Sequence, residues 1–466
     1  MSSLWTSAEL CEALGVEFSL DKPVKSVVID SRRAEYGALF VALQGERVDG
    51  HDYVVSAFEK GASAALVRED KVTSAMREAA SLHKAALLEA PEVEKALAAL
   101  GRYRRLQSRA LTFAVTGSVG KTSVKEMLAF MLSHIGETHA TQGNYNNHLG
   151  LPLTLANMRR DAAYAVIEAG MNHEGELREL THIAQPDVAV VTMIAPVHLA
   201  NFPNMEGVAT AKAEIFEGVP EGGVLVAAEN HPYADILRDA AARMKGRRYV
   251  SAGAPDSDAR VVDYMPEREE SVIGASIFGK SYVFRLGAPG RHQANNAVLA
   301  LAALKAADVN VAAVIDRLVD FFPVKGRGAR LVPESGKFKG LTIVDDSYNA
   351  GPASVCAAIE TVGERLKQGE SFFLALGDML ELGEGTEKYY RMIAHALVNA
   401  KAKGAYLVGK DCAVMKNALP DSMICATFPD SETLAENIAS ILPADVGILL
   451  VKGSRGMKME KIIEAF

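Results

Sequence analysis

A short glycine-containing stretch, Gly117-Ser-Val-Gly-Lys-Thr122, combines residue types that bind phosphate groups. Glycines at this spacing let backbone N–H groups converge on phosphate oxygens, the lysine reaches the terminal phosphates, and the threonine hydroxyl holds Mg²⁺. The full consensus has a glycine where this chain has Val115, so the match is to the shorter form Gly-x-x-Gly-Lys-Thr. We therefore predict a site for ATP and Mg²⁺ formed by Thr116, Gly117, Ser118, Val119, Gly120, Lys121 and Thr122.

The segments on either side of this loop have the patterns that such a site requires. Residues 111–115 form an apolar run typical of a strand, and residues 121–134 carry apolar side chains at helical spacing. The N-terminus of a helix that follows directly also favours the negative charge of a phosphate. The alternative is a glycine-rich turn with an incidental lysine, but the order of strand, loop and helix favours nucleotide binding.

Two further polar residues follow predicted strands of the same region. Glu168 comes directly after the apolar run 164–167, and His198 follows the run 188–194. Ligands collect at the carboxyl edge of parallel strands, so both side chains would complement Thr122 as metal ligands if these strands flank the loop. Mg²⁺ prefers oxygen, however, which makes histidine an unusual ligand. Taken alone, each residue is more simply explained as a polar strand end.

Lys212 lies in a predicted helix, in the stretch Ala211-Lys-Ala-Glu-Ile-Phe216. A lysine between apolar neighbours commonly packs its aliphatic stem on the protein and keeps its ammonium in water. Neither composition nor spacing distinguishes this lysine from the others in the chain.

The composition is that of a globular protein with several domains. Hydrophobic residues make up 49% and charged residues 23% of the 466 residues, and domains average roughly 150 residues. The formal net charge of −8 offers no basic surface for nucleic acid. The four cysteines lack metal-ligand spacing. We expect a cytoplasmic protein, because the sequence has no signal-peptide pattern and no run of ~18 apolar residues.

The order of predicted elements divides the chain into three domains of the α/β class. Residues 1–88 form a small α/β module of short strands and turns. Residues 89–322 begin with a helix and continue as a phosphate-loop ATPase-type domain with a parallel sheet. A glycine-rich, basic stretch at 323–330 predicts a hinge, and residues 323–466 again alternate strands and helices, as in an open Rossmann-like sheet.

Nine strings spread over all three predicted domains resemble those of the Mur ligases, the ATP-dependent enzymes that build the peptide of bacterial cell-wall precursors. They occur in the family's order, so the likeness is far more specific than one phosphate loop. Two of them, Asp345-Asp-Ser-Tyr-Asn-Ala350 and Gly377-Asp-Met-Leu-Glu-Leu-Gly383, resemble the members that add D-alanyl-D-alanine. The other strings span Asp30–Arg32, Leu43–His51, Thr116–Met127, Gly143–Thr154, Glu168–Asn172, Gly290–Asn296 and Lys452–Arg455.

This resemblance implies an ATP-dependent acid–amino-acid ligase with an acyl-phosphate intermediate. The N-terminal domain would hold UDP-N-acetylmuramoyl-tripeptide, the central domain ATP and Mg²⁺, and the C-terminal domain would close over both and bind D-alanyl-D-alanine. The products would be UDP-N-acetylmuramoyl-pentapeptide, ADP and phosphate. We expect a monomer with no nucleic-acid partner and no membrane insertion. Whether the third residue of the tripeptide is lysine or diaminopimelate stays open.

The resemblance also implies roles in catalysis and metal binding. Lys212 aligns with a lysine that these ligases carbamylate, which turns a cation into a carboxylate-like metal ligand. The implied catalytic residues are Lys121, His198 and Lys212. The implied metal-binding residues are Thr122, Glu168, His198 and, if carbamylated, Lys212.

Further implied binding residues lie outside the loop. Asn296 matches the family's adenine-side asparagine, and Arg327 and Asp346 match residues that reach ATP from the C-terminal domain. Arg330 is a rival for the arginine role. The implied substrate-binding residues are Ser31, Arg32, Asp49, His51, Thr141, Asn146 and Asn147. Aspartate, serine and asparagine also favour turns whatever the function, which is the structural alternative at these positions.

Two other functions compete with this interpretation. A folylpolyglutamate synthase would share the ATP chemistry but would not need the N-terminal Asp30-Ser-Arg32 module. A regulatory phosphate-loop protein would hydrolyse nucleotide slowly and form no amide. Phosphate release that depends on D-alanyl-D-alanine would separate the ligase from the regulatory protein.

Overall fold

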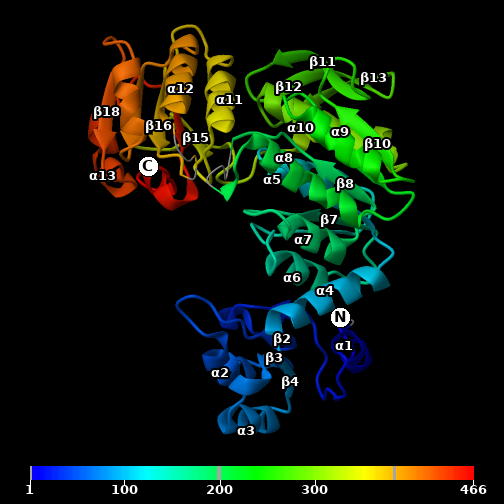
Figure 1. Ribbon diagram of the computed structural model, residues 1–466. Helices are drawn as coiled ribbons and strands as arrows, with labels where there is room; N and C mark the ends of the chain where they lie inside the picture. Colours follow the sequence, from blue (N-terminus) through cyan, green and yellow to red (C-terminus); the bar gives the residue numbers. More distant parts are fainter. Residues whose placement is uncertain (1–2, 197–200, 381, 383–384) are drawn as a thin grey trace.

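The structure, a computed structural model, describes residues 3–196, 201–380, 382 and 385–466. Within these residues the chain forms three successive sheets, of four, nine and six strands. Figure 1 shows one body around each sheet, from the N-terminal domain in blue through the central domain in green to the C-terminal domain in orange and red. The predicted α/β class with three domains is confirmed. The boundaries placed at residues 88 and 322 stay predictions.

The N-terminal sheet is parallel and buried on both faces. Along β2, Leu39 and Val41 join one apolar cluster while Phe40 joins another, because successive strand residues point to opposite faces. Burial on both sides explains why residues 38–41 are all apolar. The strands are β1 (Ser26–Val28), β2 (Ala38–Val41), β3 (Ala64–Arg68) and β4 (Ala86–Ala90), and the helices α1 (Ser7–Leu14), α2 (Val54–Glu59) and α3 (Ser74–Leu82).

The central sheet places the phosphate loop next to β7, the strand that ends in Glu168, and next to β8. Its order is β13-β12-β11-β10-β9-β8-β5-β7-β6, and β5 pairs in parallel with both β7 and β8. The helices are α4 (Val93–Gln107), α5 (Lys121–Ser133), α6 (Gly150–Ala156), α7 (Glu176–Ala184), α8 (Met205–Ala213), α9 (Ala234–Arg243) and α10 (Arg291–Ala306). The strands are β5 (Leu111–Thr116), β6 (Thr138–Ala140), β7 (Tyr164–Glu168), β8 (Val188–Val191), β9 (Val224–Ala228), β10 (Arg248–Ala252), β11 (Ala259–Pro266), β12 (Ser271–Ile277) and β13 (Lys280–Leu286).

Two strand pairs at one edge of this sheet depart from the predicted parallel pattern, whereas β10 and β11 are parallel. β11 pairs antiparallel with β12, and β12 pairs antiparallel with β13. Phe278 and Gly279 both have positive φ, at 50° and 74°, which is the backbone that a tight two-residue hairpin turn requires. Antiparallel neighbours need only such a turn, whereas parallel neighbours need a crossover.

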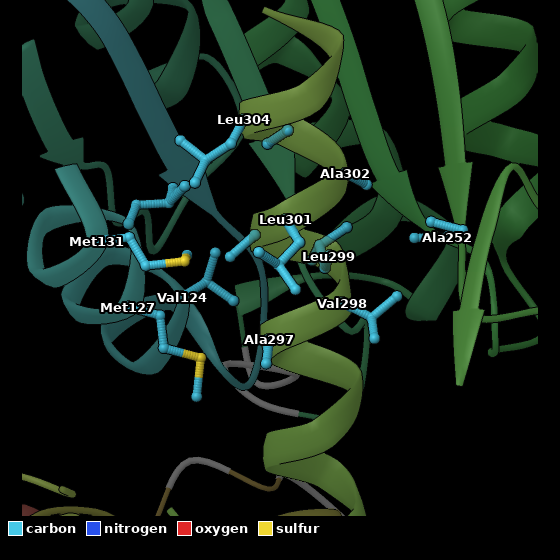
Figure 2. Packing of buried hydrophobic residues seen from close by; sticks show 14 of the residues in the cluster. Val124, Met127, Met131, Ala252, Ala297, Val298, Leu299, Leu301, Ala302 and Leu304 are labelled. Atoms are coloured by element: carbon cyan, nitrogen blue, oxygen red, sulfur yellow. The ribbon is translucent and has the colours of Figure 1, made fainter. Parts of the chain in front are cut away.

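Helix α10 fixes the position of the phosphate loop through the largest apolar cluster. Figure 2 shows Ala297 and Leu301 of α10 beside Val124 and Met127 of α5, with the sheet on the other side. Alanines dominate α10 because the helix packs against neighbours around most of its circumference. The packing holds α10 against the helix that begins directly after the loop.

The C-terminal domain is a second open sheet, as predicted. Its order is β14-β15-β19-β16-β17-β18, with β14 antiparallel to β15 and the other pairs parallel. The strands are β14 (Ala329–Leu331), β15 (Thr342–Asp346), β16 (Phe372–Gly377), β17 (Gly404–Val408), β18 (Ile424–Phe428) and β19 (Ile448–Lys452). The helices are α11 (Pro352–Gly363), α12 (Glu387–Asn399), α13 (Ser431–Ile441) and α14 (Glu460–Ile463).

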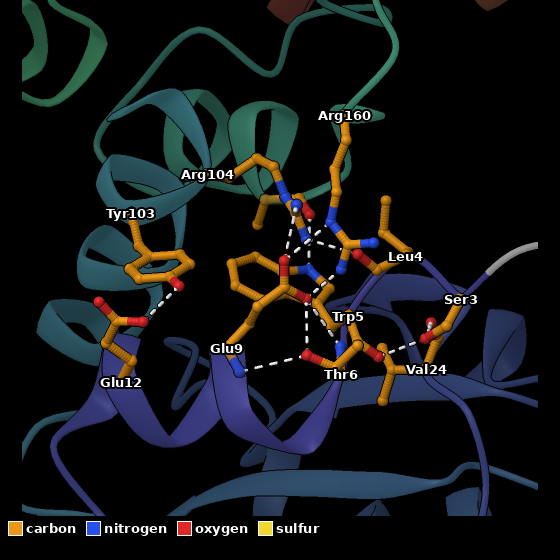
Figure 3. A network of polar contacts seen from close by, with 11 residues as sticks. Ser3, Leu4, Trp5, Thr6, Glu9, Glu12, Val24, Tyr103, Arg104 and Arg160 are labelled. Atoms are coloured by element: carbon orange, nitrogen blue, oxygen red, sulfur yellow. Dashed lines mark hydrogen bonds and ion pairs between the residues drawn. The ribbon is translucent and has the colours of Figure 1, made fainter. Parts of the chain in front are cut away.

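A buried polar network joins the first residues of the chain to the central domain (Figure 3). The Trp5 indole N–H donates to the Ala156 carbonyl at the end of α6, at 2.9 Å. The guanidinium of Arg104, from α4, lies 4.0 Å above the Trp5 ring and donates to the Leu4 carbonyl. Cation–π contacts of this kind are strongest when they exclude water. The N-terminal segment is thereby fastened to two helices of the central domain.

Candidate active site

The phosphate loop joins β5 to α5 and is fastened to the residues after β8. The backbone N–H groups of Ser118 and Val119 donate to the Met193 carbonyl at 2.9 and 3.2 Å, and the Thr192 hydroxyl donates to the Val119 carbonyl at 2.7 Å. Gly117 has φ 143°, and a Cβ there would lie 2.0 Å from the Thr192 Oγ1. The protein's own contacts therefore fix the path of the loop and require glycine at this position.

Lys121 begins α5 and turns its ammonium back over the loop. Its Nζ donates to the carbonyls of Gly117 at 2.8 Å and Ser118 at 3.3 Å. Burial lowers the pKa of this ammonium, and the carboxylate of Glu168 opposes that effect. A phosphate at the loop would offer a charged acceptor, which forms stronger hydrogen bonds than these carbonyls do.

One cavity of about 500 Å³ collects most of the residues implied for ATP and metal. Both the central and the C-terminal domain contribute to its wall. The predicted site residues that line it are Ser118, Val119, Gly120, Lys121, Thr122, Asn146, Asn147, Glu168, Asn296, Arg327 and Asp346. Cavities between domains are common ligand sites, and this one joins a phosphate loop to charged groups of a second domain.

Glu168 ends β7 and presents a buried carboxylate. Its backbone N–H donates to the Thr141 Oγ1 at 3.0 Å, and the Asn146 amide donates to its Oε1 at 2.8 Å. The residue is 2% exposed, and among the described residues its Oε2 has no hydrogen-bond partner. A buried carboxylate oxygen without a donor is costly unless a cation or another donor binds it. Glu168 therefore fits the role of a metal ligand.

Lys212 is buried in the last turn of α8, which rules out the surface-lysine alternative. It is 1% exposed. Burial lowers the pKa of its ammonium well below the usual value, and the charge of Lys121 lowers it further, while Glu176 and Glu168 act in the opposite direction. The amine thus lies close enough to interact electrostatically with Lys121 of the phosphate loop and with Glu168. We call the region around Glu168, at the end of β7, the Glu168 edge.

Asp346 and Lys452 form an ion pair at the cavity wall of the C-terminal domain. The Lys452 Nζ lies 2.5 Å from the Asp346 Oδ2 and also donates to the Asn349 carbonyl at 2.9 Å. Burial raises the pKa of the Asp346 carboxyl, and the Lys452 ammonium opposes this. Lys452 is 3% exposed, so each partner satisfies a charge that would be costly to bury alone.

Arg327 and Arg330 differ in what they contact. Arg327 lies with its guanidinium 4.3 Å from the Tyr348 ring centre. Its charge contributes to the lowered pKa of Lys121 and opposes the rise in the pKa of Asp346. Arg330 donates to the Arg268 carbonyl at 3.1 Å, at the turn between β11 and β12. Both arginines line the cavity, but Arg327 is the one whose charge acts on Lys121 and Asp346.

The implied substrate residues of the N-terminal domain lie outside this cavity. Asp49 accepts from the His51 Nδ1 at 2.6 Å, and the Arg68 N–H donates to the His51 Nε2 at 2.9 Å, so contacts within the protein use both ring nitrogens. Arg32 forms a two-pronged contact with Asp30, and its side chain is 85% exposed. The Ser31 carbonyl accepts from Lys60 at 3.0 Å. Substrate binding by these residues stays a prediction.

The three implied substrate residues near Glu168 have different surroundings. Thr141 is 1% exposed, and its hydroxyl is used by the Glu168 N–H. Asn147 accepts from the N–H groups of Leu149 and Gly150 at 3.2 and 2.9 Å, which is the turn chemistry considered as its alternative. Asn146 and Asn147 line the cavity, whereas Thr141 does not.

Comparison with family models identifies all three domains. Residues 23–107 match "Mur ligase family, catalytic domain", residues 115–304 "Mur ligase middle domain", and residues 330–455 "Mur ligase, glutamate ligase domain". A UDP-N-acetylmuramoyl-tripeptide--D-alanyl-D-alanine ligase of Rickettsia prowazekii is 32% identical over 473 residues, which cover 99% of this chain and 100% of the relative. The chain belongs to the Mur ligase family. It is an ATP-dependent ligase that forms amide bonds, as the resemblance implied.

Solved structures agree with this assignment over nearly the whole Mur ligase chain. MurF from Acinetobacter baumannii superposes with a TM-score of 0.85 and 28% identity, covering 99% of this chain and 98% of that one. MurF from Thermotoga maritima in complex with ADP gives 0.79 and 26%, covering 95% and 97%. The ADP in that relative supports ATP use by this Mur ligase.

One predicted residue of this Mur ligase cannot be placed, and several that line the cavity were missed. His198 lies outside the described residues. Among the described residues, no group of three or more His, Cys, Asp and Glu side chains is arranged to hold a metal. Lys452, Tyr348 and Asn349 line the cavity. All three belong to strings quoted for the family resemblance, but the contacts of Lys452 with Asp346 and Asn349 were visible only in the fold.

Proposed function

We propose that this Mur ligase joins D-alanyl-D-alanine to UDP-N-acetylmuramoyl-tripeptide during peptidoglycan synthesis. The observation that carries the proposal is the end-to-end match, at 32% identity, to a relative named for that reaction. The match includes the N-terminal domain, which an enzyme acting on ATP alone would not need. The two strings that resemble the D-alanyl-D-alanine-adding members support the same choice.

The proposed chemistry forms an amide in two steps. An oxygen of the tripeptide's terminal carboxylate attacks the γ-phosphorus of ATP, the β–γ bond breaks, and ADP leaves. The amine of D-alanyl-D-alanine then attacks the carbonyl carbon of the acyl phosphate and loses a proton as inorganic phosphate departs. The first step is needed because a carboxylate is a poor electrophile until one of its oxygens belongs to a leaving group.

In this scheme the protein mainly positions groups and balances charge. Lys121 would hold the terminal phosphates from the loop, and Asn296 would contact the adenine side from α10. Arg327 would reach the phosphates from the C-terminal domain. Asp346, paired with Lys452, would contact the nucleotide from the C-terminal domain. Lys121, Asn296, Arg327 and Asp346 all line one cavity, which supports these four assignments.

Mg²⁺ fits the residues at the loop and at the Glu168 edge. Thr122 and Glu168 supply oxygen atoms, and the Glu168 Oε2 has no hydrogen-bond partner among the described residues. Bound there, Mg²⁺ would neutralise charge that develops on the transferred phosphoryl group.

We further propose that Lys212 acts as a carbamate. Its neutral amine would attack CO₂, forming an N–C bond and releasing one proton, and the resulting carboxylate would face the metal edge. The depressed pKa of the buried Lys212 supports this step, because only the neutral amine reacts. A carbamate would also supply the second anionic oxygen ligand that the described side chains lack.

The proposed function is tested by the substrate dependence of phosphate release. With ATP, Mg²⁺ and UDP-tripeptide present, added D-alanyl-D-alanine should increase phosphate release and yield UDP-pentapeptide, whereas L-alanine or D-glutamate should not. Running the assay with the lysine and the diaminopimelate tripeptides identifies the third residue. Phosphate release that ignores D-alanyl-D-alanine would overturn the proposal.

Folylpolyglutamate synthesis is the less favoured alternative. A folylpolyglutamate synthase of Mycobacterium tuberculosis complexed with ADP has the related fold, with a TM-score of 0.61 at 18% identity. The superposition covers 93% of that synthase but only 80% of this chain. A ligase of that kind would leave a fifth of this chain without a counterpart.

A further inference from the structure

Lys125 is a buried lysine to which the proposed mechanism gives no role. It lies one turn beyond Lys121 on α5 and is 1% exposed. Its Nζ donates to the Thr141 carbonyl at 2.9 Å and pairs with the carboxylate of Glu126. Burying an ammonium is costly unless specific partners satisfy it. An apolar side chain would fill the same space at lower cost, so the charge needs an explanation.

Thr141, whose carbonyl accepts from Lys125, is also hydrogen-bonded to Glu168, the proposed metal ligand. Thr141 is itself 1% exposed, and its N–H donates to the Val166 carbonyl of β7 at 3.0 Å. Its Oγ1 accepts from the N–H of Glu168 at 3.0 Å. A continuous series of hydrogen bonds therefore runs from the ammonium of Lys125 through Thr141 to the backbone of Glu168.

Thr141 also stands at the start of the segment that carries Asn146. The Asn146 amide donates to the Glu168 Oε1 at 2.8 Å and leaves the Oε2 as the oxygen without a partner among the described residues. Lys125 thus holds the first residue of the segment that orients the Glu168 side chain. The same residue, Thr141, also holds the backbone of Glu168.

We propose that Lys125 is a positioning residue that holds Thr141, and through Thr141 and the Asn146 segment holds Glu168, in the orientation that binds the divalent cation. This rests on the proposed role of Glu168 as a metal ligand. Groups that orient metal ligands through hydrogen bonds commonly change metal affinity about 10- to 100-fold when they are removed.

The direction in which metal affinity changes distinguishes a positioning role of Lys125 from a simple effect of its charge. A positive charge near a cation site repels the cation, so removal of the Lys125 charge alone would strengthen metal binding. Loss of the hydrogen bond to Thr141 would instead loosen Glu168 and weaken metal binding. A weaker site in the uncharged variant can therefore arise only from geometry.

The test is a titration of the full-length protein with Mn²⁺, with the free ion followed by electron paramagnetic resonance. Lys125→Met keeps the length of the side chain and removes its donors, and should weaken Mn²⁺ binding about 10- to 100-fold. Thr141→Val keeps the carbonyl that Lys125 uses but removes the hydroxyl that accepts from Glu168, and should weaken it in the same way. The control Glu126→Gln changes the other partner of the ammonium, which is 32% exposed, and should alter affinity less than about threefold.

Near-ultraviolet circular dichroism and ADP binding report whether each variant is folded. Unchanged or tighter Mn²⁺ binding by folded Lys125→Met would overturn the positioning role. If Lys125→Met fails to fold, unchanged binding by Thr141→Val overturns it instead. A different result would contradict the proposed metal site itself. In that case the wild-type protein would bind no Mn²⁺, or Glu168→Gln would bind Mn²⁺ as tightly as the wild type does.

Discussion

The phosphate loop and the Glu168 edge face one cavity but are built differently. The loop is a continuous stretch whose backbone is held by hydrogen bonds to the residues after β8. At the edge, Glu168 comes from β7 and Asn146 from the segment before α6, while Lys212 is buried nearby in α8. The loop therefore depends on its own sequence and one neighbouring strand, whereas the edge depends on packing among distant segments. We expect the two regions to respond differently to substitution.

Removal of the loop's charge should have the largest effect. Lys121→Ala should lower the rate of phosphate release by about 10²- to 10³-fold, because the charged phosphates lose a preorganised donor. The measurement is the D-alanyl-D-alanine-dependent rate with saturating substrates. Added amines or carboxylic acids should not restore it, and a variant that kept a tenth of the wild-type rate would contradict the role of Lys121.

Substitution of Lys212, the buried lysine at the Glu168 edge, should cause a large loss of activity that added carboxylic acids partly restore. Lys212→Ala should lower the rate by at least about 100-fold through loss of the metal ligand. Short carboxylic acids such as acetate should restore part of this activity by replacing the carbamate oxygens. Lys121→Ala provides the matched control, since the same acids should leave it inactive. Complete loss without rescue would contradict carbamylation of Lys212.

Backbone changes should affect the loop more than the segment beside the edge. Gly117→Ala places a Cβ 2.0 Å from the Thr192 Oγ1, and should weaken ADP binding by at least about tenfold through strain. Gly143→Ala is the matched control. Gly143 also has a positive φ, of 54°, but no atom lies within 4 Å of the added Cβ. Isothermal titration calorimetry with ADP measures both. Equal affinities in the two variants would remove the proposed difference.

The last expected effect is on stability and not on binding or turnover, and it concerns the helix that packs beside the loop. Burial lowers the pKa of His292 on α10 to about 4, and the charges of Lys452 and Arg365 contribute. The folded state thus binds fewer protons than the unfolded state between about pH 6.5 and pH 4, so stability falls as pH falls through this window, by at most about 3 kcal/mol. Urea unfolding of wild type and His292→Asn at pH 7 and pH 5 measures this, and identical losses would exclude His292 as the cause.

The sequence was sufficient for most of the parallel fold. Apolar runs that ended at turn residues predicted β5 and β7 closely, because buried parallel strands are apolar on both faces. The antiparallel β11–β13 was missed, although residues 271–277 alternate in burial and Phe278-Gly279 forms a tight turn. Hydrophobic alternation and the glycine were both visible, but the pairing partners depend on the tertiary fold.

The two regions of the site also differed in how far sequence alone could predict them. Lys121 and Thr122 followed from a local pattern whose spacing has a physical meaning. Lys212 did not, since its burial arises from α8 packing over the sheet and no local pattern records it. Lys125 lay inside a quoted string, yet its contact with Thr141 joins residues 16 positions apart and became apparent only in the structure.

The most direct test of the proposed chemistry follows one oxygen atom. UDP-tripeptide labelled with ¹⁸O in its terminal carboxylate is incubated with ATP, Mg²⁺ and D-alanyl-D-alanine, and the released phosphate is examined by mass spectrometry. An acyl-phosphate intermediate predicts that each phosphate carries one oxygen from the carboxylate. Phosphate without the label, formed alongside the amide product, would contradict the account.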